Sequence, residues 1–236
     1  MSITTGVGAR SAPATGIWVL TAGCWSVLIV LSSTGIGHPG HDDVAGGGAG
    51  LVDVAGFLAG WLTMVGAMML PVMAPATRHL PARADGRTPV LVAAFAAVWA
   101  ASGLLALAGD AVVHRVVDGW AWLAARPGLV VAGVLLLAGV LRLAAPAAAG
   151  RGHVAPPAEA GAGAWGTGLR LGTRSLVSDG PLMLVMFTAG SGDLGLMVML
   201  TAVMFAERHE RWGGRIAVLI GCALVAAGAV VAVASR

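Results

Sequence analysis

Long apolar segments dominate this chain and constrain what it can fold into. Hydrophobic residues make up 58% of the 236 residues, and charged residues only 11%. A soluble domain of this length could not bury so much apolar surface. A helix needs about 20 apolar residues to cross a bilayer, and seven segments approach that length: residues 16–36, 51–76, 89–110, 127–145, 168–190, 193–206 and 215–234. We therefore expect one all-α domain over residues 1–236, a polytopic membrane helix bundle of about seven transmembrane helices.

The arginines predict how this bundle is oriented. If the N-terminus is cytoplasmic, only Arg115, Arg126 and Arg236 of the 14 basic residues face outward. Cytoplasmic connections carry the excess of arginine in membrane proteins, so we predict a cytoplasmic N-terminus. Fusing residues 181–206 into one helix would give six spans with a poorer charge distribution. The Pro-, Ala- and Gly-rich residues 150–163 are then a cytoplasmic linker.

Basic composition here does not indicate nucleic-acid binding. The arginines are scattered at helix ends rather than clustered with aromatic residues, as they are in nucleic-acid interfaces. The absence of lysine, with abundant Ala, Gly and Val, is typical of a GC-rich bacterial genome. We expect a multi-pass protein of the bacterial inner membrane, with the lipid bilayer as its main partner.

Methionines concentrate in the second apolar segment. Residues 61–75, WLTMVGAMMLPVMAP, hold four methionines and two prolines. By helical spacing Met64 and Met68 share a stripe with Asp53, whereas Met69 and Met73 point to the other side. Such a stripe is either an ordinary packing face or a path for a soft metal ion.

The fifth and sixth segments repeat the combination of an acid with methionines. Asp179 lies near the middle of the fifth segment, where a carboxylate costs a few kcal/mol unless it is paired, protonated or bound to a cation. Pairing with Arg174 is the structural alternative. The stripe of Asp179 also contains Met183 and Met186, and that of Asp193 contains Met197 and Met204 but not Met199.

Convergence of these three faces would build an intramembrane pocket lined by thioethers and carboxylates. Thioether sulfur suits Cu(I), which makes copper the first candidate. For any single methionine, packing is the commoner role. The loop GHPGHDD at residues 37–43 adds two imidazoles, either as a site of first metal capture or as a plain solvated loop. The candidate ligands are Met64, Met68, Asp179, Met183, Met186, Met197 and Met204, with Asp53, His38 and His41 at the capture site.

Sequence motifs of enzymes are missing from the chain. It has no P-loop, dinucleotide-binding glycine fingerprint, HExxH or GxSxG. No apolar segment carries a histidine near its middle, so a haem held by two histidines is not expected. We therefore expect a protein that is not an enzyme.

Two segments resemble an uncharacterised bacterial family of predicted metal-binding integral membrane proteins. The first is the WxxMxxAMMLPxxxP pattern of residues 61–75, and the second is residues 168–208, ending in Ala-Glu-Arg where the family closes with Glu-Lys. The resemblance implies cysteines in the fifth span, where this chain has Ser175, Ser178 and Asp179. This member therefore has only Met, Asp and His to offer a metal, and thiol redox chemistry is not expected.

The leading hypothesis is that the protein binds or handles a transition metal, copper first, in the outer half of the membrane. The main alternative is a structural or assembly subunit that docks a membrane or periplasmic protein and uses its methionines as adaptable packing. A proton-coupled carrier of a small solute comes third, and it would need Asp179 exposed to alternating cavities.

Overall fold

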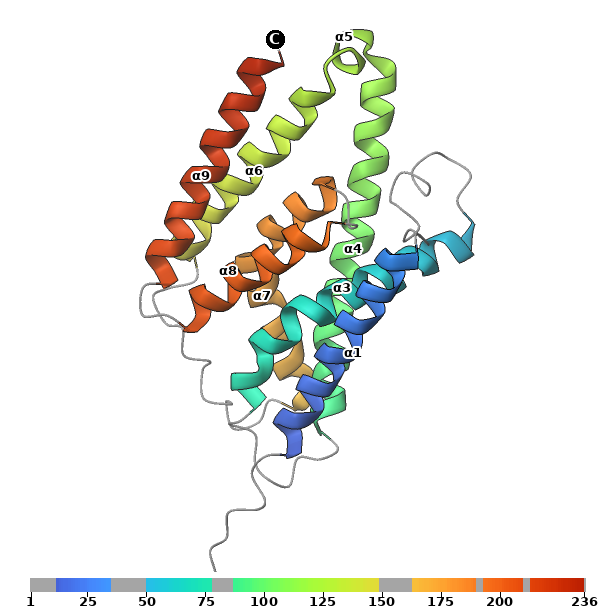
Figure 1. The fold of residues 1–236 in the computed structure, drawn as a ribbon, viewed down its shortest axis with the longest axis vertical. Coiled ribbons are helices and arrows are strands. Elements are labelled where there is room, and N and C mark those ends of the chain that lie inside the picture. The colour runs from blue at the N-terminus through green and yellow to red at the C-terminus, as the bar shows by residue number, and fades with distance from the viewer. Residues whose placement is uncertain are drawn as a thin grey trace, which may run out of the picture.

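All elements of the described chain are helices, which confirms the all-α prediction (Figure 1). The computed structural model describes residues 12–34, 50–77, 87–148, 163–189, 193–209 and 213–235, and these contain no strand. The helices are α1 Ala12–Thr34, α3 Leu51–Thr77, α4 Arg87–Gly119, α5 Ala121–Ala124, α6 Pro127–Ala148, α7 Ala164–Ala189, α8 Leu194–His209 and α9 Gly213–Ala234.

Five helices are long and apolar enough to cross a membrane. Their candidate spans are Thr15–Thr34, Leu51–Pro71, Thr88–Gly119, Pro127–Ala144 and Gly213–Ala234, which agree with five of the seven predicted segments. The other two predicted segments form α7 and α8. Helix α8 has only 16 residues, and α7 contains two arginines, an aspartate and a proline. The chain thus has the helices of a multi-pass membrane protein, while the count of seven and the cytoplasmic N-terminus remain predictions.

Helix α4 is longer than the sequence predicted. It ends at Gly119 rather than at residue 110, and its 33 residues extend for about 50 Å. A single-turn helix, α5, follows it at the same end of the molecule as the C-terminus (Figure 1). The indoles of Trp120 and Trp122 are exposed there, and the guanidinium of Arg126 lies 4.8 Å from the ring centroid of Trp122. Exposed Trp with Arg is typical of the depth of lipid headgroups.

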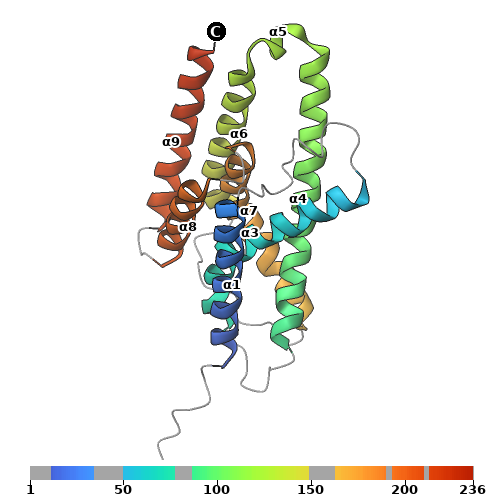
Figure 2. The same cartoon turned by 45° about the vertical axis from the view of Figure 1, so that its right-hand side comes forward.

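Three helix pairs build the bundle, and glycines bring each pair close together. Helices α6 and α9 run side by side in both views (Figures 1 and 2), α4 packs along α7, and α1 packs along α3. A Cβ on Gly139 of α6 would lie 2.9 Å from the carbonyl oxygen of Gly221 in α9. A Cβ on Gly172 of α7 would lie 2.9 Å from Cβ of Val98 in α4. Small residues at such contacts are typical of helix packing within membranes.

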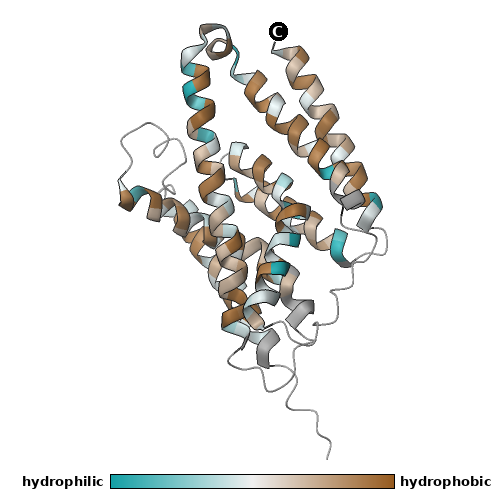
Figure 3. Ribbon diagram, turned by 180° about the vertical axis from the view of Figure 1, so that it is seen from behind, coloured by the Kyte–Doolittle hydropathy of each residue, from teal (hydrophilic) through white to brown (hydrophobic). Residues whose placement is uncertain are grey.

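Apolar side chains face outward as well as inward, while several charged and polar side chains are buried. Large apolar side chains such as Leu105 and Leu219 are more than two-thirds exposed, and hydrophobic colour covers the outer helices (Figure 3). Arg142 and Asp179, by contrast, are 2% and 1% exposed. This distribution suits a protein whose outer surface meets lipid, where internal polar groups must find partners within the protein.

Replacing Gly139 by Ala tests the α6–α9 contact. The added methyl group would meet Val225 Cγ2 at 2.7 Å as well as the backbone of α9. We expect overpacking to cost about 1–3 kcal/mol and to lower the apparent Tm of the detergent-solubilised protein.

Gly133→Ala is the matched control on the same helix, because a Cβ at Gly133 meets nothing within 4 Å. Its Tm should stay the same or rise, since Ala favours a helix over Gly by roughly 1 kcal/mol. Equal Tm values for Gly139→Ala and Gly133→Ala would contradict the proposed close approach of the two helices.

Candidate metal site and its ion-pair network

Eight methionines lie in one buried core, contributed by three helices. Each is at most 4% exposed, and all belong to a single contiguous cluster of buried residues. Helix α3 supplies Met64, Met68, Met69 and Met73, α7 supplies Met183 and Met186, and α8 supplies Met197 and Met204. We call these eight residues the methionine cluster. Met199, which helical spacing placed off the stripe, is 55% exposed.

The two sides of α3 are both buried, which differs from the expected one-sided stripe. Met69 and Met73 were expected to point away from Met64 and Met68, yet they are 0% and 4% exposed. The reason is that α3 packs against α1, α4 and α8 at once. The cluster therefore includes two methionines that the sequence analysis left out.

Two of the predicted acids accept backbone hydrogen bonds at the starts of helices. The Oδ2 atom of Asp53 accepts a hydrogen bond of 2.8 Å from the backbone N–H of Gly50, and Oδ1 of Asp193 accepts one of 3.0 Å from the N–H of Leu196. These are the bonds of helix N-caps, which also favour an acid at the positive end of the helix dipole. Both residues are exposed. His38 and His41, the other members of the predicted capture site, lie outside the described residues.

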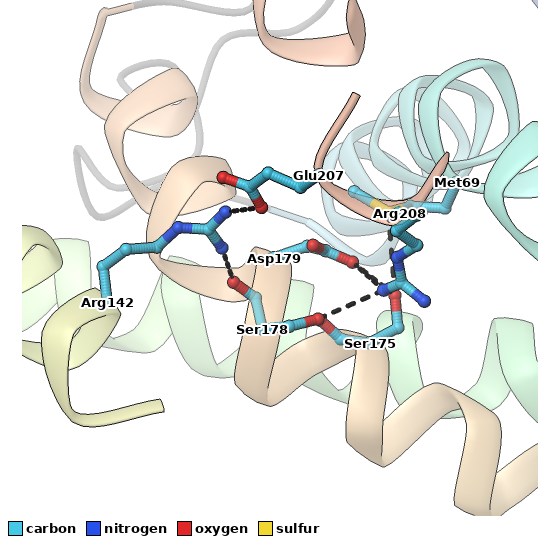
Figure 4. A network of polar contacts seen from close by, with 7 residues as sticks. All are labelled: Met69, Arg142, Ser175, Ser178, Asp179, Glu207 and Arg208. Atoms are coloured by element: carbon cyan, nitrogen blue, oxygen red, sulfur yellow. Dashed lines mark hydrogen bonds and ion pairs between the residues drawn. The ribbon is translucent and has the colours of Figure 1, made fainter. Parts of the chain in front are cut away.

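Asp179 is enclosed and paired. Its Oδ2 atom accepts a 2.5 Å hydrogen bond from Nη2 of Arg208 and a 3.0 Å bond from Oγ of Ser175 (Figure 4). The partner is therefore Arg208 rather than Arg174, which is exposed. The Ser175 hydroxyl also lies 3.7 Å from Sδ of Met69. Because a hydroxyl has one proton, it donates either to the carboxylate or to the weaker sulfur acceptor, and it links the ion pair to the methionine cluster.

A second ion pair lies beside the first. The guanidinium of Arg142, 2% exposed in α6, binds Oε2 of Glu207 in α8 and donates to the carbonyl oxygen of Ser178 in α7 (Figure 4). Glu207 is itself only 8% exposed. We call Arg142, Glu207, Asp179 and Arg208 the ion-pair network. It ties three helices together from the inside.

Sequence reasoning missed most of this network. It considered the arginines, Arg142 and Arg208 included, only as charges at the ends of helices. The partners stand 65 residues apart in one pair and 29 in the other, so periodicity within a helix could not join them. The available signal was the position of Arg142, before the end of an apolar segment with no acid of its own.

The thioethers are the soft ligands that the described chain gathers in one place. Within the described residues, no group of three or more His, Cys, Asp and Glu side chains could hold a metal ion. Cys24 and Cys222 are both free thiols, on α1 and α9 respectively. A metal ion bound here would therefore meet a neutral, apolar, sulfur-rich core with a carboxylate–guanidinium pair at its edge.

Comparison with known families agrees with a metal-related protein. A family model described as PpoB2, copper chaperone, matches residues 58–231, from α3 into α9. The match covers well over half of the chain, and the protein therefore belongs to this copper chaperone family. No curated protein and no solved structure matches it. A family described as chaperones fits the expectation of a non-enzymatic protein.

Replacing Arg142 by Met tests the ion-pair network. The change leaves the carboxylate of Glu207 buried without its cation, which should destabilise the fold by about 3–5 kcal/mol. The double variant Arg142→Met, Glu207→Met removes both charges and should recover most of the lost Tm in detergent. Arg174→Met, at an exposed position of α7, is the control and should leave Tm unchanged. A double variant no more stable than Arg142→Met alone would show that the two charges do not depend on each other.

Proposed function

We propose that this protein holds Cu(I) on the methionine cluster within the membrane and passes it to a partner protein. The observation that carries the proposal is the cluster itself: eight buried thioethers from three helices in one core. Membership of a copper chaperone family supports copper as the cargo. In this view α7 and α8 complete a seven-span bundle of the bacterial inner membrane.

The chemistry of the cluster suits a monovalent soft ion. Thioether sulfur is a soft, neutral ligand that prefers Cu(I) to Mg²⁺ or Ca²⁺. Five of the methionines, Met68, Met69, Met186, Met197 and Met204, are 0% exposed, so water does not compete for the bound ion. Without copper, the same flexible side chains fill the core as ordinary apolar residues. A copper-free state is therefore stable, as a chaperone that loads and unloads requires.

The neighbouring ion pair provides charge for the bound cation. Neutral thioethers leave the positive charge of Cu(I) uncompensated, which is costly in an apolar interior. Asp179 is buried, whereas the side chain of its partner Arg208 is 34% exposed. Movement of Arg208 toward water would leave the Asp179 carboxylate to balance the ion, and Ser175 already connects that carboxylate to Met69.

The burial and pairing of Asp179 favour copper binding over a proton-coupled carrier. Such a carrier would need Asp179 to meet aqueous cavities in turn, but the residue is 1% exposed and paired with Arg208. The alternative of an assembly subunit makes no use of thioether chemistry. It predicts that exchanging Met for Leu is silent, and this distinguishes it from copper binding.

The test is a quadruple Met→Leu variant of the fully buried positions Met68, Met186, Met197 and Met204. Leu keeps the apolar volume and removes the sulfur, so the fold should survive with small losses. Competition with a chromophoric Cu(I) chelator, on detergent-purified protein kept reduced, should give an affinity lower by about tenfold or more, which is about 1.4 kcal/mol. The quadruple variant and the protein with the intact cluster both carry Cys24→Ala and Cys222→Ala, so that thiols do not contribute to Cu(I) binding.

Met199→Leu is the matched control, because Met199 lies on α8 but is 55% exposed. Its Cu(I) affinity should equal that of the unaltered cluster. If the quadruple variant binds Cu(I) as tightly as this control, the cluster is packing only and the assembly role becomes the better account.

A further inference from the structure

A groove of about 530 Å³ lies between α4, α6 and α7. Its walls are apolar, formed by side chains that include Leu105 and Ala106 of α4, Leu141 of α6 and Val177 of α7. Leu105 is 73% exposed and Val177 47% exposed, so the groove opens at the outer surface of the bundle. The groove can therefore be reached from the outer surface of the protein.

Met183 connects this groove to the methionine cluster. It is 1% exposed and belongs to the buried core, and it is also part of the groove lining. Among the methionines that the structure describes, Met183 alone is in that lining. Trp61 and Trp99 line the same groove, and indole faces attract cations. The groove therefore leads to one particular thioether of the cluster.

Helix α7 contains a proline two residues before Met183. Pro181 lies inside the helix and has no N–H to donate to the carbonyl of Val177, which loosens a helix at that turn. Gly180, the preceding residue, adds backbone freedom. Val177, Gly180 and Pro181 all line the groove. A small movement at this turn would expose the sulfur of Met183 without unfolding the rest of α7.

We infer that the groove is the port through which Cu(I) leaves the cluster, with Met183 as its last ligand. The inference rests on the proposed copper binding. A bare cation would not cross an apolar groove, so a soft donor atom of the acceptor enters it and bonds to the copper. The bond from copper to Met183 Sδ then breaks. Copper stays Cu(I) throughout, and no proton or electron is transferred.

Narrowing the groove tests the inference without touching the ligands. Val177→Trp fills it from α7, and Ala106→Trp fills it from the α4 wall if the first variant is poorly folded. Cu(I)-loaded protein is mixed in a stopped-flow instrument with excess neocuproine, a small apolar chelator whose Cu(I) complex absorbs visible light. We expect unchanged equilibrium affinity and release slower by about tenfold or more.

Val198→Trp is the control, since Val198 is 55% exposed on α8 and does not line the groove. Its release rate should match that of the unaltered protein. Release at the unaltered rate from both groove variants would overturn the port, as would equal slowing in Val198→Trp. Failure of the unaltered protein to take up Cu(I) would instead overturn the proposed function itself, so the two failures are distinguishable.

Discussion

The ion-pair network holds helices α7 and α8, called here the α7–α8 hairpin, against α6 and against each other inside the bundle. In a lipid environment, each buried charge of this hairpin must be satisfied within the protein. Arg142 of α6 pairs with Glu207, and Arg208 pairs with Asp179, so each of the two buried carboxylates of α7 and α8 has a guanidinium partner. Positioning of the hairpin in turn brings its four buried methionines into the same core as those of α3. The thioether core thus depends on the polar pairs beside it.

Sequence periodicity predicted which side chains lie in this core better than it predicted which residues they contact. Spacing on one helix correctly separated Met197 and Met204 from Met199, because burial follows a face of the helix. It could not identify Arg208 as the partner of Asp179, since that contact joins different helices. Nor could it foresee that α3 is covered on several sides, which buries Met69 as well as Met68. Within-helix geometry is local, whereas partners and coverage depend on the assembled bundle.

Two opposing requirements meet in this architecture. The proposed copper binding needs a dry, sulfur-rich interior, and the proposed delivery needs one ligand within reach of an acceptor. The fully enclosed methionines satisfy the first requirement. Met183, beside the proline-weakened turn of α7 and the groove, is placed for the second. The Asp179–Arg208 pair lies at the edge of this core, linked to it through Ser175 and Met69, and in the proposed function it supplies the charge that balances the bound ion.

X-ray absorption spectroscopy of the Cu(I)-loaded protein tests the central claim most directly. The sample should be the Cys24→Ala, Cys222→Ala variant, in which methionine is the only remaining source of protein sulfur. The account predicts Cu(I) surrounded mainly by sulfur, with fewer sulfur ligands in the quadruple Met→Leu variant, which removes four of the eight cluster methionines. A copper site made of nitrogen and oxygen ligands, unaltered by the methionine substitutions, would contradict it.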